Sequence, residues 1–225
     1  MAADTSERDP DLPEPHAWLG RVSAGIVAYG WSDSEAADLR EGIDAALRAV
    51  QIDEKSPYAH YALAITSVYA SAFDQATRAA EKAAELSPSF ALGHLVLGMA
   101  RLFSGNASDA IEPLEHGLQL NPYDPQNFVW YNVLALAQFF TRRADNALKC
   151  VVRALKIRPN WRPAMETAAC CYLALGRSEA AQECIEHMAR LEKPSGDALL
   201  PFKRRNPHWI EEMIALLRKA GWQEC

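Results

Sequence analysis

The sequence predicts an all-α protein in which antiparallel helix pairs stack into a solenoid. Its 225 residues are 49% hydrophobic, which is enough to bury a sizeable core. Ala and the aliphatic residues dominate, and the sequence lacks the alternating Val, Thr and Tyr runs, bounded by turn residues, that mark strands. The stretch AAELSPSFALGHLVLG (83–98) also repeats the pattern of AVQIDEKSPYAHYALA (49–64) after 34 residues. Self-similarity at this interval indicates a helical repeat array.

Three proline-ended segments mark the period along the chain. They are ELSP (Glu85–Pro88), QLNP (Gln119–Pro122) and KIRP (Lys156–Pro159), which recur at 34 and then 37 residues. Each follows an Ala- or Leu-rich run, and a second helix-like segment begins after each. Because proline cannot continue a helix, we interpret each period as two helices and two turns.

In register, the sequence divides into four clear units and one degenerate unit ahead of them. The clear units are Pro57–Phe90, Ala91–Asp124, Phe128–Trp161 and Arg162–Gly196, with Pro125-Gln126-Asn127 inserted between the second and the third. The degenerate unit fits Ser23–Ser56. We therefore predict a disordered tail at 1–15 and a solenoid at 16–196, with repeats at about 23–56, 57–90, 91–124, 128–161 and 162–196.

Small residues recur where two helices of a unit would approach closely. A Leu followed by Ala or Gly recurs on the first helix, and Ala recurs on the second: Leu63-Ala64, Leu97-Gly98 and Leu134-Ala135, then Ala76, Ala110, Ala147 and Ala181. In the degenerate unit, Tyr29-Gly30 occupies the site of the Leu-Ala or Leu-Gly pair. Gly105 and Gly176 fall in the turn inside a unit, where a positive φ costs glycine little.

This pattern resembles the tetratricopeptide repeat, which spans 34 residues and carries a large residue, Leu-Gly, Tyr, Ala, an aromatic residue and Pro in that order. The sequence departs from it in two ways. The large residue of the first helix is His60, His94, Tyr131 or Met165 instead of Trp, and the last unit has Ala168-Ala169 in place of Leu-Gly. The resemblance implies a right-handed superhelical solenoid with a concave groove lined by the first helices.

The period ends after Gly196, and residues 197–225 carry a different pattern. Pro207 is followed by apolar residues at helical spacing, and Ala220-Gly221 ends the run. A solenoid needs a terminal element with one polar face. We therefore predict that this amphipathic helix is a C-terminal cap.

Composition and charge restrict the partners and the location. A net charge of −6 and a pI near 5.5 argue against a nucleic-acid surface, which needs clustered Lys and Arg. The most apolar window, Phe128–Phe140, is too short for a bilayer, and Asn132 and Gln138 interrupt it. The start, MAADTSERDPDLPEPH, lacks the pattern of a signal peptide. We expect a cytoplasmic protein with no membrane partner and no nucleic-acid partner.

Catalytic and metal-binding motifs are not present in the sequence. It has no Gly-rich phosphate loop, His-Glu-x-x-His, Gly-x-Ser-x-Gly or Cys-x-x-Cys, so we expect no enzyme, no cofactor and no metal. A reactive thiol at Cys170 or Cys171 would be the enzymatic alternative, and it would need a nearby cation to lower its pKa. His60 and His94 repeat as equivalent packing positions, with a paired metal or pH-sensing site as their alternative.

The resemblance implies binding of a peptide or helix in the concave groove. By position, the residues that would line this groove are Tyr58, Tyr61, Ile65, Leu92, Leu95, Val96, Met99, Val129, Asn132, Val133 and Leu136, with Ala62, Glu166, Thr167 and Cys170 beside them. Family members that grip a chaperone's terminal carboxylate use Lys, Arg and Asn there, whereas this set has one Asn and no cation. We therefore expect an apolar groove for an amphipathic helix or an adjacent domain. Alternatively, these residues are core, covered by the solenoid's curvature or by the C-terminal helix.

A narrower resemblance concerns the details of the repeats. Ala59-His60, Gly93-His94, the NPYDP junction at 121–125 and the Leu217–Gly221 ending are similar to arrays attached to bacterial class III adenylate or guanylate cyclases and winged-helix regulators. This resemblance implies an interaction module in bacterial signalling or regulation. A self-assembling scaffold that forms homo-oligomers, or a regulatory fragment whose output domain is absent, are the alternatives.

Overall fold

The computed structural model describes residues 11–191 and 206–222, and within these ranges it contains eleven helices and no strand. In chain order the helices are α2 (Pro13–Ala28), α3 (Glu35–Ile52), α4 (Pro57–Tyr69), α5 (Phe73–Leu86), α6 (Ala91–Phe103), α7 (Ala107–Leu120), α8 (Asn127–Phe140), α9 (Ala144–Ile157), α10 (Arg162–Ala174), α11 (Ser178–Ala189) and α13 (Pro207–Lys219). The all-α prediction is confirmed. None of the described helices is long and apolar enough to cross a membrane.

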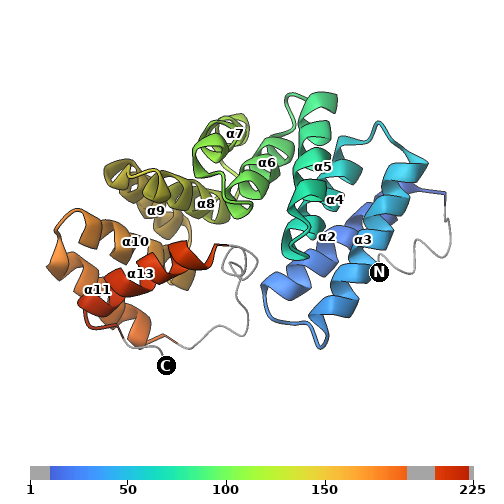
Figure 1. Ribbon diagram of the computed structural model, residues 1–225. Helices are drawn as coiled ribbons and strands as arrows, with labels where there is room; N and C mark the ends of the chain where they lie inside the picture. The colour runs from blue at the N-terminus through green and yellow to red at the C-terminus, as the bar shows by residue number, and fades with distance from the viewer. Residues whose placement is uncertain (1–10, 192–205, 223–225) are drawn as a thin grey trace.

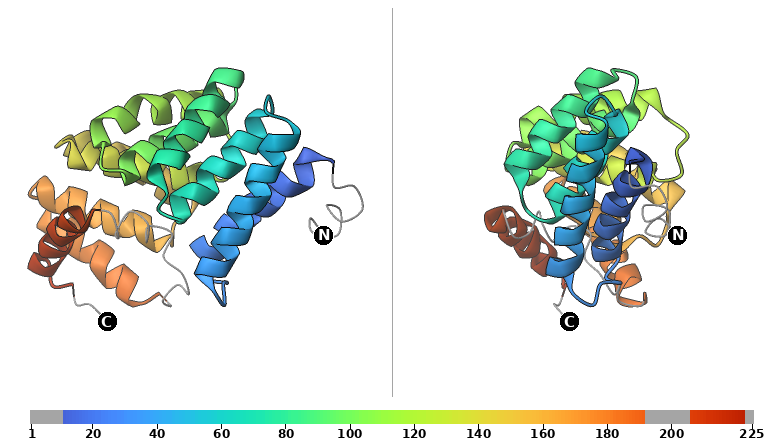
Figure 2. Two further views of the ribbon diagram at one scale, coloured as in Figure 1. Left: turned by 45° about the vertical axis from the view of Figure 1, so that its right-hand side comes forward. Right: turned by 90° about the vertical axis from the view of Figure 1, so that its right-hand side faces the viewer.

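The helices from α2 to α11 form five antiparallel pairs that stack side by side. Each helix packs on its partner in the pair, and the first helices also pack on one another, α2 on α4, α4 on α6, α6 on α8 and α8 on α10. The stack curves into an arch, with the α2–α3 pair at one end and the α10–α11 pair at the other (Figures 1 and 2). The pairs α4–α5, α6–α7 and α10–α11 lie within clear units that the period indicates, and the α8–α9 pair begins one residue before its unit, at Asn127.

The first pair differs from the prediction in its register. Helix α2 already begins at Pro13, so the predicted tail is wrong for residues 13–15, while residues 1–10 lie outside the described part. Proline suits the first turn of a helix, where its missing N–H would have no intrahelical partner. Gly30, at φ 68°, lies in the turn after α2 and not at a helix contact.

The close contact of the first pair is made by Gly20. A Cβ on Gly20 would lie 2.9 Å from the Cβ of Ala46. In the α6–α7 pair, a Cβ on Gly98 would lie 2.3 Å from Cγ of Leu114. Leu19-Gly20 is therefore the first unit's counterpart of Leu97-Gly98, and small residues allow the helices of a pair to pack closely in both units.

The turn inside each pair has the same backbone form. Gly105 and Gly176 have φ values of 106° and 72°, as their places in the sequence predict. The corresponding turns of the α4–α5 and α8–α9 pairs place Ser71 and Arg142 in this region, at φ 60° and 63°. The turn geometry is therefore imposed by the pair as a whole and is not set by glycine alone.

Histidines at equivalent positions of two units contact the turn between their own unit and the preceding one. Nε2 of His60 lies 2.9 Å from the carbonyl oxygen of Glu54, and Nε2 of His94 lies 2.9 Å from that of Pro88. Each ring thus contacts the turn that leads into its own helix. This confirms equivalent packing roles, and the described residues contain no group of His, Cys, Asp and Glu that could hold a metal ion.

Helix α13 reaches back over the inner helices of three pairs. The Asn206 amide donates to the Phe103 carbonyl at the end of α6, over 2.9 Å, and Trp209 stacks on Phe140 at the end of α8. The Cys170 thiol of α10 lies 3.8 Å from the Met213 carbonyl. The sequence predicts that this helix is a C-terminal cap. In the structure it packs on α10 of the last pair and also contacts Phe103 at the end of α6 and Phe140 at the end of α8. The segment 192–205 before it lies outside the described residues.

Candidate functional site

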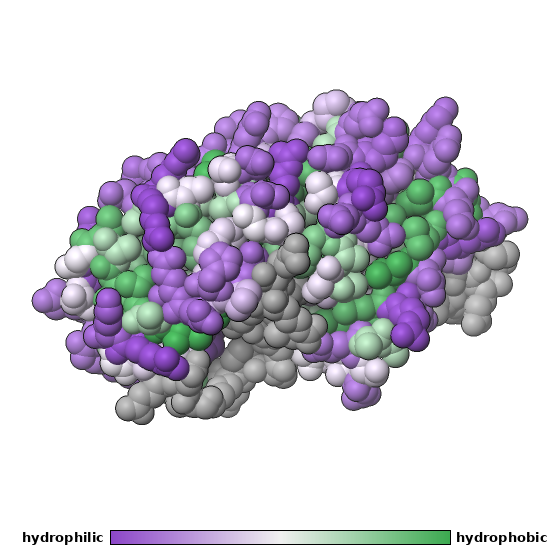
Figure 3. Space-filling view, in the orientation of Figure 1, coloured by the Kyte–Doolittle hydropathy of each residue, from purple (hydrophilic) through white to green (hydrophobic). Residues whose placement is uncertain are grey.

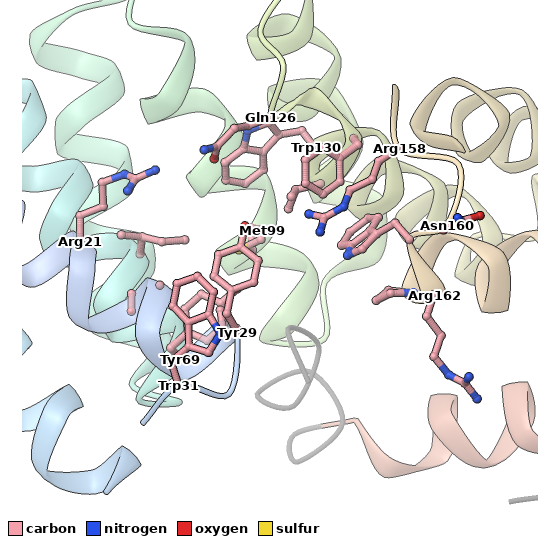
Figure 4. Close-up of a pocket in the computed structure, with 18 of the residues that line it drawn as sticks. Arg21, Tyr29, Trp31, Tyr69, Met99, Gln126, Trp130, Arg158, Asn160 and Arg162 are labelled. Atoms are coloured by element: carbon pink, nitrogen blue, oxygen red, sulfur yellow. The ribbon is translucent and has the colours of Figure 1, made fainter. Parts of the chain in front are cut away.

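A pocket of about 360 Å³ opens on the inner side of the arch. We call it the inner pocket. Its walls come from α2, the α2–α3 turn, α4, α6, the start of α8 and the turn before α10. The lining residues are Arg21, Ala24, Gly25, Ala28, Tyr29, Trp31, Tyr61, Ile65, Tyr69, Met99, Gln126, Phe128, Val129, Trp130, Arg158, Asn160, Trp161, Arg162, Pro163 and Leu191. Figure 4 shows many of them converging from α2 on one side and from the α8–α10 region on the other.

The curvature of the solenoid creates this pocket. Arg21 on α2 and Arg158 at the end of α9 lie in different repeats, yet both line it. Successive first helices pack side by side with a rotation at each step, so that the two ends of the array turn toward one another. The site therefore depends on the assembled array and is not contained in a single unit.

Aromatic residues recur in the lining of the pocket, and two of them are exposed. Tyr29 and Trp31 stack with ring centroids 5.1 Å apart, and they are 40% and 70% exposed. Across the pocket, Phe128 and Trp161 meet edge to face at 4.8 Å. The exposed Tyr29–Trp31 pair offers a ligand a large apolar area with little loss of side-chain freedom.

Three arginines line the inner pocket, and they differ in how they are held. Arg162 is fixed by α10 and α11, because its Nε lies 3.3 Å from Glu166 and an Nη donates to the Met188 carbonyl over 3.2 Å. The guanidinium of Arg158 lies over the Phe128 ring at 5.1 Å, and that of Arg21 lies over the Trp18 ring at 5.7 Å. Neither Arg21 nor Arg158 forms an ion pair with a carboxylate of the described residues.

Two tyrosines near Arg21 stay neutral at physiological pH. Burial raises the pKa of Tyr58 to about 12, although the charge of Arg21 opposes the rise. Burial likewise raises the pKa of Tyr61, and Arg21 again offsets part of the shift, while Asp124 adds to it. The hydroxyl of Tyr58 is buried and has no hydrogen-bond partner among the described residues. The positive charge of Arg21 is therefore not neutralised by a tyrosinate.

The groove residues expected from the sequence divide into two groups. Tyr61, Ile65, Met99 and Val129 line the inner pocket. The others do not line it: Tyr58, Leu92, Leu95, Val96, Asn132, Val133 and Leu136. Of these, Leu95, Val96, Asn132, Val133 and Leu136 are at most 2% exposed and belong to the core, whereas Tyr58 and Leu92 are half-buried. Of the neighbouring positions, Ala62, Thr167 and Cys170 are fully buried.

The composition of the pocket also differs from the expected apolar groove without cations. The predicted register of the first unit begins at Ser23 and therefore leaves Arg21 outside the first helix. In the register that the structure shows, the spacing of Pro57, His60 and Leu63-Ala64 is repeated by Pro13, His16 and Leu19-Gly20. Arg158 and Trp161 lie in the turn before α10, outside the first-helix positions. The repeated Pro, His and Leu spacing was the signal that could have placed Arg21 on the inner helix.

The cysteines of the described residues have raised pKa values. Burial raises the pKa of Cys150 to about 11 and that of Cys171 to about 12. The pKa of Cys170 is raised well above its usual value for the same reason, with Cys171 adding to the shift. Thiols with these pKa values are protonated near neutral pH, and the protonated thiol is a poor nucleophile. The enzymatic alternative at Cys170 or Cys171 therefore has no support in the structure.

A second apolar surface lies along α3, outside the inner pocket. Leu39, Ile43, Tyr69 and Ala70 line a shallow hollow there with Arg40 and other charged residues of α3. Figure 3 shows an apolar strip along α3, bordered by polar residues. The hollow lacks the exposed aromatic pair that distinguishes the inner pocket.

Comparisons with known proteins agree with the architecture. Residues 163–193 match the family model of the tetratricopeptide repeat. The chain is 27% identical over 171 residues to human DnaJ homolog subfamily C member 7, an alignment that covers 72% of this chain and 35% of that protein. The chain thus spans about a third of the length of this relative.

Solved structures share the fold at low sequence identity. The PilF structure from Pseudomonas aeruginosa has a TM-score of 0.67 at 17% identity and covers 96% of this chain and 90% of PilF. YrrB, described as a TPR protein with an unusual peptide-binding site, has a TM-score of 0.57 at 14% identity, covering 96% of this chain and 97% of YrrB. The repeat pattern, the stacked helix pairs and these matches together assign the chain to the tetratricopeptide repeat fold.

Proposed function

We propose that this protein is a non-catalytic interaction module that binds a segment of a partner protein in the inner pocket. The tetratricopeptide repeat fold implies protein–protein interaction. The observation that carries the proposal is the meeting, in one open pocket, of the exposed Tyr29–Trp31 ring pair with Arg21 and Arg158 from distant units. Neither of these arginines forms an ion pair with a carboxylate of the described residues. The pocket's volume of about 360 Å³ suits a few side chains of a peptide.

Helix α13 supports this proposal, because it is an amphipathic segment of this chain that packs on α10 and contacts the ends of α6 and α8. Its buried residues Met213 and Leu217 face the array, while Glu211 and Arg218 are exposed. Trp209 provides an aromatic anchor on α8, and Glu212 pairs with Arg142 in the α8–α9 turn. A partner segment would use the same kinds of contact at the inner pocket, which no described residue of α13 lines.

The setting of this interaction is also a proposal. The similarity of the NPYDP junction and the Leu217–Gly221 ending to arrays of bacterial cyclases and winged-helix regulators favours a cytoplasmic role in bacterial signalling. In that setting the partner is a separate regulatory protein or an output domain linked to this one. The description of YrrB as having a peptide-binding site is consistent with a peptide ligand for the same fold.

Selection from a random peptide library tests the function. A phage-displayed library of twelve-residue peptides is panned on the wild-type chain and on Trp31→Ala, and the binding of recovered peptides is measured by fluorescence polarisation. We expect Trp31→Ala to weaken binding about tenfold, because a large apolar contact is lost. Tyr123→Ala is the matched control, since Tyr123 is 93% exposed and lies outside the pocket.

Two results would contradict the proposed function. One is a library that yields no peptide above background. The other is a set of peptides that bind Trp31→Ala and wild type equally, which would place the binding surface elsewhere. Light scattering at micromolar concentration accompanies the selection, because a dimer that Trp31→Ala dissociates would favour the self-assembling scaffold instead.

A further inference from the structure

The inner pocket has a polarity that distinguishes it from the rest of this acidic chain. The whole sequence has a net charge of −6, yet the pocket lining contains three arginines and no carboxylate among the described residues. Gln126 and Asn160 add neutral polar groups to the lining. Two acids lie close to the pocket lining. Asp124 raises the pKa of Tyr61 and accepts hydrogen bonds from the Asn121 side-chain amide and the Gln126 backbone N–H, and Glu166 pairs with Arg162.

Arg21 and Arg158 are the two arginines whose guanidinium groups a ligand in the pocket could contact. Figure 4 shows Arg21 and Arg158 pointing into the pocket from opposite walls, whereas Arg162 points away toward α11. Arg21 and Arg158 each rest on an aromatic ring, Trp18 and Phe128 respectively. A guanidinium has five N–H donors, so Arg21 keeps donors for a carboxylate even though it also hydrogen-bonds the Tyr61 side chain.

The surface between these arginines is apolar. Met99 and Tyr69 are buried lining residues and form its floor, whereas Trp31 is 70% exposed and lies at its rim. Met99 is 2% exposed and adds a flexible, polarizable side chain to the floor. A ligand that placed charge here would lose hydration without gaining a partner, whereas an apolar side chain would be buried favourably.

On this basis we propose that the inner pocket recognises an acidic peptide segment in which one aromatic or large aliphatic side chain lies between two carboxylates. The apolar side chain packs between Trp31 and Met99, and the carboxylates on either side pair with Arg21 and Arg158. Each guanidinium can donate two parallel N–H bonds to a carboxylate, which makes the pairing directional. This inference rests on the proposed function, and it names the chemistry of the ligand at the same site.

A protein segment fits these observations better than a nucleic acid. A strand of phosphates would extend beyond the two arginines and meet a surface of net negative charge. A peptide can carry carboxylates at the two positions that face Arg21 and Arg158 alone, and its apolar side chain can pack on the floor of the pocket. Nucleic-acid binding is nevertheless an explicit outcome of the experiment below.

The test uses the peptides recovered from the random library on the full chain. We expect the recovered set to be enriched in Asp and Glu around one aromatic or large aliphatic residue. Replacing the acids of a recovered peptide by their amides should weaken binding about tenfold per acid, as loss of a charged hydrogen-bonded pair does. Binding should also weaken as the salt concentration rises from about 0.05 M to about 0.5 M.

Variants of the chain assign this effect to the two arginines. Arg21→Gln and Arg158→Gln should each weaken acidic peptides about tenfold while changing amide-substituted peptides little. Arg78→Gln is the matched control, because Arg78 is exposed on α5 outside the pocket and should leave binding unchanged. Circular dichroism verifies that the variants keep their helix content.

The outcomes separate the two proposals. Peptides that depend on Trp31 but are neutral or basic would overturn the acidic ligand and leave the proposed function intact. If the recovered peptides bind wild type and Trp31→Ala equally, or if no peptide is recovered, both the proposed function and the acidic ligand are refuted. A labelled twelve-nucleotide single-stranded DNA that binds more tightly than any recovered peptide, and loses binding in Arg21→Gln and Arg158→Gln, would assign the arginines to phosphate and overturn the inference.

Discussion

The indole of Trp209 lies nearly parallel to the ring of Phe140, with ring centroids 4.5 Å apart and 10° between their planes. This stacking joins α13 to the end of α8, far from it in the sequence. Together with the hydrogen bond from Asn206 to the Phe103 carbonyl, it fixes where α13 crosses the inner helices. Among the described residues, none that belongs to α13 lines the inner pocket.

Truncating the stacked ring should loosen α13. We expect Trp209→Ala to lower the free energy of unfolding by about 2 kcal/mol, because Trp209 is only half-buried and full burial of Trp is worth more. Hydrogen exchange should show faster exchange of α13 amides than in wild type. His208→Ala changes an exposed neighbour, and protection of α13 that is equal in all three proteins would show that the stack does not hold the helix.

Two helical glycines, Gly98 in the close α6–α7 contact and Gly25 in α2, should respond differently to replacement by alanine. Gly98→Ala should destabilise the protein by about 1–3 kcal/mol, because the new Cβ would meet Leu114 at 2.3 Å and the Ala110 carbonyl at 2.9 Å. Gly25→Ala should be neutral or stabilising by up to about 1 kcal/mol, since an added Cβ would meet no atom within 4 Å beyond the backbone of its own helix, and Ala favours a helix. Urea denaturation measures both, and equal effects would argue against the helix spacing described above.

The turn between α4 and α5 offers a stabilising substitution. Ser71 has a φ of 60°, a region that costs an L-residue more than glycine. Ser71→Gly should therefore raise the free energy of unfolding by about 0.5–1 kcal/mol, after the greater entropy of glycine in the unfolded chain is subtracted. Ser71→Ala keeps the strain and should not stabilise. Thermal unfolding of the three proteins gives the comparison, and a lower melting temperature for Ser71→Gly would refute the strain argument.

Stability should decline in alkaline solution because the buried thiols and Tyr58 must ionise on unfolding. The pKa of Cys171 is raised from 9.0 to about 12, and that of Cys150 from 9.0 to about 11. A raised pKa favours the folded state fully below pH 9, and this contribution is lost as the pH rises toward 12. We expect a roughly flat unfolding free energy from pH 7 to 8.5 and a loss of a few kcal/mol by pH 11. Cys171→Ala should reduce this slope, and an unchanged slope would show that the thiol is not protected.

The fold was predictable from sequence wherever units share one length. Pro57, Ala91 and Arg162 begin helices at the places that the period indicates, because proline punctuation and small-residue contacts are local features. The first unit was misplaced because it is longer than the others. Matching Leu19-Gly20 to Leu63-Ala64 requires a spacing of 44 residues instead of 34.

The inner pocket was less predictable, since it depends on how far the array rotates over several units. Arg21 and Arg158 are separated by most of the chain, and no local pattern places them opposite one another. Several expected groove residues, such as Val96 and Leu136, are instead buried between helices, because their side chains fill the space between inner helices that pack side by side. Their apolar character was visible in the sequence, but the degree of curvature that covers them was not.

The measurement that tests the central claim most directly is an NMR titration of the full chain with a recovered acidic peptide, observing indole and guanidinium N–H signals. Binding in the inner pocket predicts that the Trp31 indole and the Arg21 and Arg158 side chains shift together as the complex saturates. The N–H signals of the Trp209 indole on α13 and of the Arg78 side chain on α5 should not shift. Shifts confined to α3 or α13, with Trp31 and both arginines unchanged, would contradict the account.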